Sequence, residues 1–389
     1  MVDHTEIQYE WFIEIAVLLI AARLMEGVVE RLRQPKVFAW IIIGLALPFL
    51  GYHVSIVTSL LGILGIIVYL FYIGLEGSLR GFLKGLKTAG PVAFGGVAAA
   101  LLIPIPVGLL LGLGFQESFA LGVALGATSV TLTVKTMEEL GKLHSREGQA
   151  ILGAAVVDDV LGLALLSTLL GITEGETVSV ILTIVEIAVL AFAVWFGIAY
   201  AFQKVGKPLY RYFSRLSDEA PGLTLTFAIL LIFSYFAVQL RLSSILLAYA
   251  LGLGLSTHRY IAKKVESLMY PLIVLFTPLF FIDAGSLLNV EELFGINFGK
   301  SLVVIITVII LGFLTKLIGC YIPARLLGFS HRDSLVIGVG MVPRAEVMMT
   351  VALAAKDSGI MGSSTYLGLI LLLPITSLIV PPLIAKLYR

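Results

Sequence analysis

The chain has 389 residues, of which 59% are hydrophobic and 13% charged, and its mean hydropathy is +1.05. This balance is typical of a polytopic membrane protein and leaves no evident soluble domain. The net charge of +1 gives no reason to expect a nucleic-acid partner, because in a membrane protein the position of each charge is informative and the sum is not.

The apolar segments predict an all-α polytopic membrane protein. A hydrocarbon core needs roughly 20 apolar residues per crossing helix, which predicts about 13 transmembrane helices here. The predicted spans are 8–33, 36–51, 55–77, 88–114, 118–140, 147–171, 177–204, 221–240, 244–257, 265–286, 300–326, 332–356 and 362–386. The spans at 36–51 and 244–257 are short for a full crossing.

Basic residues gather in every second connection between these spans. The alternate connections carry mainly glutamates. The basic connections hold Arg31, Arg33 and Lys36; Arg80, Lys84 and Lys87; Lys142 and Arg146; Lys204, Lys207, Arg211 and Arg215; Arg259, Lys263 and Lys264; Arg325 and Arg332; and Lys386 and Arg389. The positive-inside rule then predicts an N-terminus outside and a C-terminus in the cytoplasm.

The first six spans can be laid over the last six at an offset of about 213 residues, with one span left between them. One extra crossing inverts the second half relative to the first, and inverted repeats are typical of transporters. We therefore predict one membrane transporter unit over 1–389, with a first repeat at 1–171, a linker helix at 177–205 and a second repeat at 221–388.

The overlay aligns two sequences that form helix poorly. Residues 126–133 read GATSVTLT, with clustered hydroxyl and β-branched side chains, and residues 338–344 read GVGMVPR. Either alone fits an intact helix with back-bonded Ser and Thr or a proline kink. Because both occupy equivalent repeat positions, we predict two broken helices whose freed carbonyls line an ion site.

Asp158 and Asp159 lie in the middle of an apolar run. A carboxylate at that depth costs at least about 2.5 kcal/mol, so the pair predicts binding of a proton or cation. The two side chains point about 100° apart around a helix, and two such close carboxylates do not both ionise cheaply. One interpretation is that one aspartate is paired with another group while the other binds and releases a proton. The structural alternative is that both are protonated acids that form hydrogen bonds between helices.

Four further charged residues fall within apolar segments. Lys316 is far from both helix ends, so it needs a carboxylate partner or must lose its proton. That pair is either a static bridge or one that opens when an ion takes the carboxylate. Arg344 and Glu346 follow the second break, where compensation of helix ends is at least as good an interpretation as a direct role in transport. Asp283 stays unassigned.

Residues 153–163, GAAVVDDVLGL, resemble the ion-binding motif of the monovalent cation:proton antiporters, in particular the NapA-like sodium/proton branch. The double aspartate with a downstream lysine is the most specific part. Further motif positions of that branch match residues 31–35, 73–76, 127–129, 139–141, Lys316 and 338–347. Two positions depart from the pattern: Ala39-Trp40 replaces a Gly-Glu pair, and Asp283 replaces an apolar or small residue.

The resemblance implies a NhaA-like fold with two crossed, unwound helices and an elevator movement of a core domain past a homodimer-forming domain. The core would include about 88–171 and 300–356, and the dimer domain about 8–51 and 221–257. It also implies the site residues: Asp159 as the principal cation and proton site, Asp158 paired with Lys316, Thr128 and Ser129 lining the site, and Arg344 with Glu346 balancing the helix ends.

We therefore predict a secondary active sodium/proton antiporter, not an enzyme, and the resemblance implies a prokaryotic plasma membrane as its location. The resemblance associates an aspartate pair with electrogenic exchange of two protons per sodium. Neither a metal-ligand spacing nor a nucleotide-binding loop is present in the sequence, so we expect no cofactor and an ion gradient as the energy source. The alternatives are potassium/proton exchange, or a cation channel or sensor on the same fold.

Overall fold

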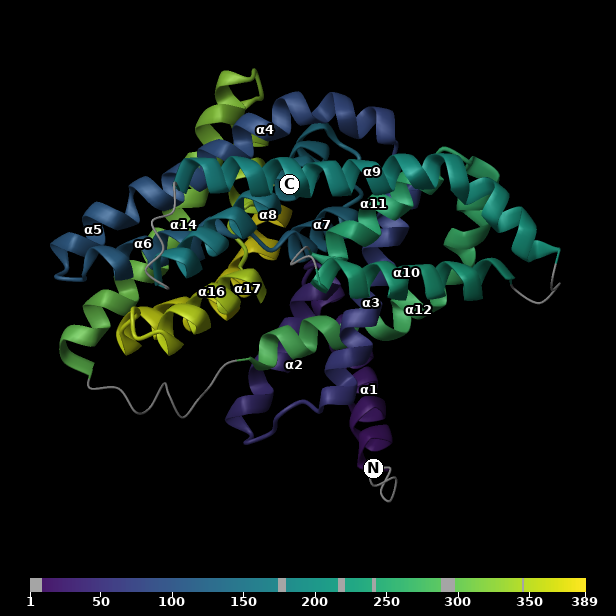
Figure 1. Cartoon of the computed structure of the whole chain (residues 1–389). Helices are drawn as coiled ribbons and strands as arrows, with labels where there is room; N and C mark the ends of the chain where they lie inside the picture. Colours follow the sequence, from purple (N-terminus) through teal and green to yellow (C-terminus); the bar gives the residue numbers. More distant parts are fainter. Residues whose placement is uncertain (1–8, 174–179, 216–220, 240–242, 288–297, 345) are drawn as a thin grey trace, which may run out of the picture.

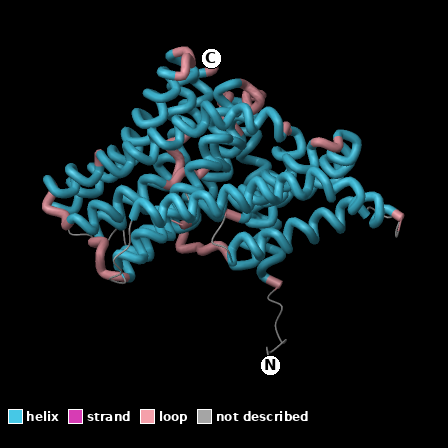
Figure 2. The backbone as a smooth tube through the Cα atoms, turned by 45° about the horizontal axis from the view of Figure 1, so that its top comes forward, coloured by secondary structure: helices cyan, strands magenta, loops and turns pink. Residues whose placement is uncertain are grey.

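The computed structural model describes residues 9–173, 180–215, 221–239, 243–287, 298–344 and 346–389. Within these ranges every regular element is a helix, as Figure 2 shows, which confirms the all-α class. The first half contains α1 (Glu10–Arg31), α2 (Lys36–Phe49), α3 (Ile56–Glu76), α4 (Leu79–Leu102), α5 (Pro104–Leu110), α6 (Phe115–Gly126), α7 (Val130–Glu139) and α8 (Arg146–Thr173).

The second half begins with a long helix that runs across the molecule in Figure 1. Its helices are α9 (Val180–Ser214), α10 (Pro221–Gln239), α11 (Ser244–Ser256), α12 (Arg259–Ser286), α14 (Phe298–Leu326), α15 (His331–Gly340), α16 (Glu346–Asp357) and α17 (Ser363–Leu387). Seven helical stretches of the described chain are long and apolar enough to cross a membrane, and shorter apolar helices lie between them. The count of thirteen crossings stays a prediction.

Three helices extend beyond the spans predicted for them. The span predicted from 88 begins at Leu79, because Ser78 caps the helix by accepting a hydrogen bond from the Gly81 amide at 3.3 Å. The linker helix predicted to end at 205 continues to Ser214, and its last turn carries Arg211 at the negative end of the helix dipole. Helix α12 begins at Arg259 and not at 265.

Close helix packing depends on glycines at particular contacts. A Cβ atom on Gly252 of α11 would lie 2.2 Å from the Phe71 carbonyl oxygen of α3, so no larger residue fits there. On the other side of the molecule, a Cβ on Gly95 of α4 would lie 2.4 Å from the Gly319 carbonyl oxygen of α14. Small residues allow backbones in a membrane to approach closely.

Helix α4 also packs against α8, where a Cβ on Gly153 would lie 2.8 Å from the Ala89 methyl group. It therefore lies against both α8 and α14 and brings their middle turns together. Gly96 of α4 leaves space for the Cys320 and Lys316 side chains of α14, since a Cβ there would lie 2.6 Å from Cys320 Sγ and 3.2 Å from Lys316 Cδ. The fold thus places two buried charges side by side.

Candidate cation-binding site

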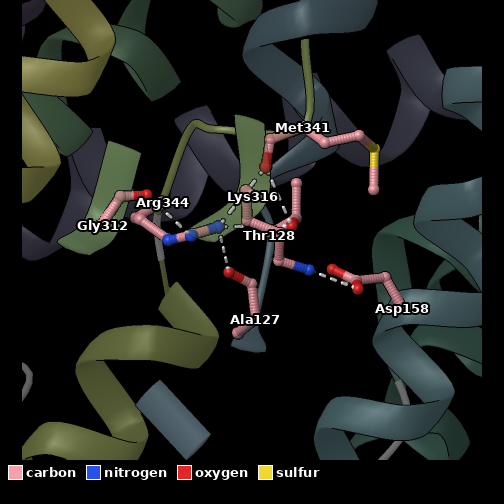
Figure 3. Close-up of polar contacts among 7 residues, drawn as sticks. All are labelled: Ala127, Thr128, Asp158, Gly312, Lys316, Met341 and Arg344. Carbon is pink, nitrogen blue, oxygen red and sulfur yellow. Dashed lines mark hydrogen bonds and ion pairs between the residues drawn. The ribbon is translucent and has the colours of Figure 1, made fainter. Parts of the chain in front are cut away.

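Two interrupted helices meet at the site, as the sequence predicts. Helix α6 ends at Gly126 and α7 begins at Val130, and Ala127 and Ser129 between them have extended backbone. The second interruption separates α15 from α16. The Ser129 amide donates to the Pro343 carbonyl at 2.8 Å, and the Thr128 hydroxyl donates to the Met341 carbonyl at 3.2 Å (Figure 3). The two breaks therefore bond directly to each other.

The Arg344 side chain holds this crossing together. It is 1% exposed, and its Nη1 donates to the Ala127 carbonyl at 2.8 Å while Nη2 donates to the Gly312 carbonyl of α14 at 3.2 Å. Longer contacts reach the Thr128 hydroxyl and the Met341 carbonyl. The carbonyls at the end of α6 carry partial negative charge, which the guanidinium compensates. The Glu346 side chain lies outside the described part of the structure.

Sequence reasoning missed two contributors to the crossing. The Thr133 hydroxyl, which is fully buried, donates to the Gly340 carbonyl at 2.6 Å, one turn beyond Ser129. Gly312 supplies its carbonyl to Arg344 from a position one helical turn before Lys316. The clustered hydroxyls of residues 126–133 were the available signal for Thr133. No side-chain pattern could indicate a backbone carbonyl.

The ion pair of the site joins α8 to α14. Lys316 Nζ lies 2.5 Å from Asp158 Oδ1, and the two side chains are 0% and 1% exposed. Figure 3 shows the lysine passing the Thr128 and Arg344 group and pointing to Asp158. Removing either partner would leave the other charge buried and uncompensated, which is strongly destabilising.

Asp158 uses only one of its carboxylate oxygens in this pair. Its Oδ2 atom is buried and has no hydrogen-bond partner among the described residues. Buried polar atoms are nearly always paired, so an exception needs an explanation such as an ion or a water molecule. Asp159 follows on the same helix and is partly buried. A cation bound here would find hard oxygen ligands, which suit Na⁺.

The structure therefore brings most of the predicted site residues into one region. Thr128, Ser129 and Arg344 form the crossing, and Asp158 with Lys316 lies beside it in Figure 3. Ser129 contributes mainly its backbone amide, while its hydroxyl lies 3.2 Å from the Thr131 hydroxyl. The Thr128 hydroxyl points into the group formed by Arg344 and the carbonyls.

A charged cavity of about 830 Å³ lies at the opposite end of α7. Its charged lining comes from α1, α2 and α7 and comprises Arg23, Glu26, Glu30, Lys36, Lys135, Glu138 and Glu139, with Arg33 from the loop before α2. Glu139 Oε2 accepts the Lys36 backbone N–H at 2.5 Å, which connects α7 to the start of α2. Of the residues that the structure describes, those lining this cavity do not include Asp158 or Asp159.

The two positions that depart from the branch pattern are accommodated by specific contacts. Trp40 stacks on Phe281 with ring centroids 5.7 Å apart, and its indole N–H donates to Glu26 Oε1 at 3.0 Å. Asp283 is half-buried, and its Oδ1 accepts from the Ser59 hydroxyl at 2.9 Å. Both residues thus fix the packing of α12 against α2 and α3.

An all-helical membrane chain with two crossed, interrupted helices beside a buried ion pair belongs to the class of polytopic membrane proteins built like ion transporters. The sequence profile of the family described as sodium/hydrogen exchanger, transmembrane, matches residues 15–387. The chain belongs to this family, and so to the monovalent cation:proton antiporter superfamily.

Individual relatives agree with this assignment. The chain is 29% identical over 388 residues to the Na(+)/H(+)-K(+) antiporter GerN of Bacillus cereus, covering 97% of this chain and 96% of that protein. It is 30% identical over 382 residues to the probable Na(+)/H(+) antiporter GerT of Bacillus cereus, covering 97% and 99%. A solved structure of the sodium proton antiporter MjNhaP1 of Methanocaldococcus jannaschii has the same fold, with a TM-score of 0.66, 16% identity, and coverage of 97% and 95%.

Proposed function

We propose that the chain is a secondary active antiporter that exchanges Na⁺, and also Li⁺, for H⁺. The observation that carries this proposal is the buried Asp158 Oδ2 atom, which has no partner in the described structure and lies one residue from Asp159. The name of GerN, a Na(+)/H(+)-K(+) antiporter, and that of GerT, a probable Na(+)/H(+) antiporter, support the same reaction class.

The exchange chemistry is competition for one carboxylate group. Na⁺ binds Asp159 with help from Asp158, the Thr128 hydroxyl and the carbonyls near Ser129, and a proton binds the same carboxylate when Na⁺ leaves. A carboxylate that is paired with a proton or with Na⁺ crosses the membrane at a lower cost than a bare one. Only loaded forms therefore cross, and this couples the two flows.

The charge balance of the site favours electrogenic exchange. The ionised carboxylate of Asp158 pairs with the buried ammonium group of Lys316. Protonation of Asp158 releases Lys316 from its pair and provides the second proton site beside Asp159. Exchange of one Na⁺ for two protons then moves one net charge in each cycle.

The proposed movement is elevator-type alternating access in a homodimer with thirteen crossings, an outer N-terminus and a cytoplasmic C-terminus. The core domain contains α7, α8 and the crossing, and the dimer domain contains α1 and α2. The bond between Glu139 and the Lys36 amide links these two domains, so it must break when the core moves. The charged cavity at this junction offers cations a path toward the site from one side.

Potassium/proton exchange is the second candidate. Two relatives favour it: the printed name of GerN includes K⁺, and the K(+)/H(+) antiporter 1 of Saccharomyces cerevisiae is 26% identical over 411 residues, covering 95% of this chain and 45% of that protein. Carboxylate and carbonyl ligands bind both ions, and selectivity depends on cavity size and ligand number.

The deciding experiment measures cation-driven proton movement in proteoliposomes with Na⁺, Li⁺ and K⁺ in turn. We expect a response to Na⁺ and Li⁺ that Asp159→Asn abolishes, because an amide side chain does not bind and release protons near neutral pH. Rates that change when the membrane potential is clamped would support electrogenic exchange. Normal coupled transport by Asp159→Asn would refute the site, a response to K⁺ alone would select the second candidate, and no response to any cation would refute antiport.

A further inference from the structure

A basic cavity lies between the end of α9 and the start of α12. Its volume is about 590 Å³, and its charged side chains are Lys207 and Arg211 from α9 and Arg259 and Lys264 from α12. Among the described residues that line it, none is acidic. A concave surface with charges of one sign raises the local concentration of ligands of the opposite sign, so the cavity is suited to an anion.

The first turn of α12 adds backbone donors to this cavity. The N-cap residue His258 gives no side-chain cap, because its ring Nε2 donates instead to the Gln203 carbonyl of α9 at 2.8 Å. The first intrahelical bond from this end runs from the Ala262 amide to the His258 carbonyl. The amides of residues 259–261 precede that bond, and such amides together with the helix dipole bind phosphate and other anions.

A tyrosine that lines the cavity has a buried hydroxyl. Tyr210 of α9 lines the cavity and is only 9% exposed, and its hydroxyl has no hydrogen-bond partner in the described part of the chain. Buried tyrosine hydroxyls normally find a partner. A phosphate oxygen within reach of this hydroxyl would supply the missing acceptor.

The position of the cavity indicates a lipid as the source of the phosphate. Along α9 the exposed side chains change from apolar, as at Leu190 and Val205, to basic at Lys207. Tyr212 and Tyr260 are 61% and 80% exposed beside the cavity, as aromatic residues are at the level of lipid headgroups. These residues belong to the basic connections that the positive-inside rule assigns to the cytoplasmic leaflet, where anionic lipids bind basic pockets between helices.

We propose that this cavity binds the phosphate group of an acidic phospholipid. Lys207 and Lys264 neutralise the phosphate, the Tyr210 hydroxyl donates to it, and the first amides of α12 complete the site. The bound lipid connects α9 to α12, and thus the helix between the two repeats to the second repeat. This site is separate from the cation site and does not depend on which ion the protein transports.

The test uses the full chain purified in detergent, with phosphatidylglycerol as the probe. We expect phosphatidylglycerol to raise Tm and to give one retained lipid per chain in native mass spectrometry. Phosphatidylcholine and inorganic phosphate at equal concentration should do neither. A full shift in Tm with inorganic phosphate alone would overturn the lipid proposal in favour of a free anion.

Two paired variants separate the cavity from general surface charge. Lys207→Gln with Lys264→Gln removes two cavity lysines, and we expect the affinity for phosphatidylglycerol to fall about 30-fold. Lys204→Gln with Lys263→Gln makes the same charge change on the same helices outside the cavity lining, and should leave the affinity unchanged. Tyr210→Phe should lower it about fivefold with an unchanged Tm in the absence of lipid. Equal losses in both lysine pairs would overturn the proposal.

Discussion

The two fully buried cations of the site, Lys316 and Arg344, are neutralised in different ways. Lys316 pairs with the carboxylate of Asp158, whereas Arg344 donates to the carbonyl oxygens of Ala127 and Gly312. A carboxylate can take a proton or a metal ion and so release its partner, but a carbonyl does not titrate. The first contact can therefore change during a transport cycle, while the second is fixed.

This difference assigns separate tasks to the two cations. Arg344 joins the end of α6 to α14 and so holds the two broken helices together. A planar guanidinium suits this task because it carries several donors in a fixed geometry. Lys316 pairs with one carboxylate among the residues that the structure describes, so its charge is linked to whatever occupies Asp158. The substitutions below are expected to affect stability at Arg344 and coupling at Lys316.

The largest expected effect on stability is that of Arg344→Ala. It leaves the Ala127 carbonyl buried without this donor and removes the charge-assisted bond to the Gly312 carbonyl, which keeps its helical bond within α14. At about 2 kcal/mol for each change, we expect a loss of about 4 kcal/mol and a large fall in Tm. Arg344→Lys should rescue only part of it, because an ammonium group cannot reproduce the fork that reaches both carbonyls. Thermal unfolding of the purified chain measures this, and full rescue by lysine would contradict the fixed role.

An intermediate effect is expected for Lys316→Ala. It leaves Asp158 buried without its cation, which should cost about 3 kcal/mol. Adding Asp158→Asn removes the uncompensated charge, so the double variant should regain most of this loss. Among the described residues Arg344 bonds to several acceptors, so no one of their substitutions would repair its removal.

The same pair of variants tests charge coupling. If Asp158 and Lys316 provide the second proton, transport by the double variant should lose most of its dependence on membrane potential in proteoliposomes. The matched control is the unaltered chain under the same potential clamp. An unchanged voltage response would mean that the ion pair has only a structural role. Failure of Asp158→Asn to restore Tm would mean that the loss of stability in Lys316→Ala does not come from the broken 2.5 Å contact with Asp158.

The sequence predicted those elements of the site that carry a large free-energy cost. Buried charges such as Asp158 and Lys316 are costly in an apolar segment, so they stand out in the sequence. The hydroxyl cluster of 126–133 and the glycines and proline of 338–344 form helix poorly, so the two breaks can also be predicted without a structure. The partners of Arg344 are backbone carbonyls, which every residue carries, so no sequence pattern could identify Ala127 and Gly312 as its acceptors. The early start of α4 depended on one capping serine, Ser78, within a polar stretch that hydropathy does not distinguish from a loop.

The smallest expected effect separates a ligand from a structural hydroxyl at the crossing. Thr128 donates to the Met341 carbonyl and Thr133 to the Gly340 carbonyl, so Thr128→Val and Thr133→Val each remove one donated hydrogen bond of about 1 kcal/mol, and Thr128→Val also removes the longer 3.3 Å contact from Arg344. Both should lower Tm by similar amounts. Only Thr128→Val should raise the KM for Na⁺, by about fivefold, because Thr128 also contacts Arg344 beside the ion pair and Thr133 is fully buried one turn away. Equal changes in KM would show that Thr128, like Thr133, only holds the two broken helices together.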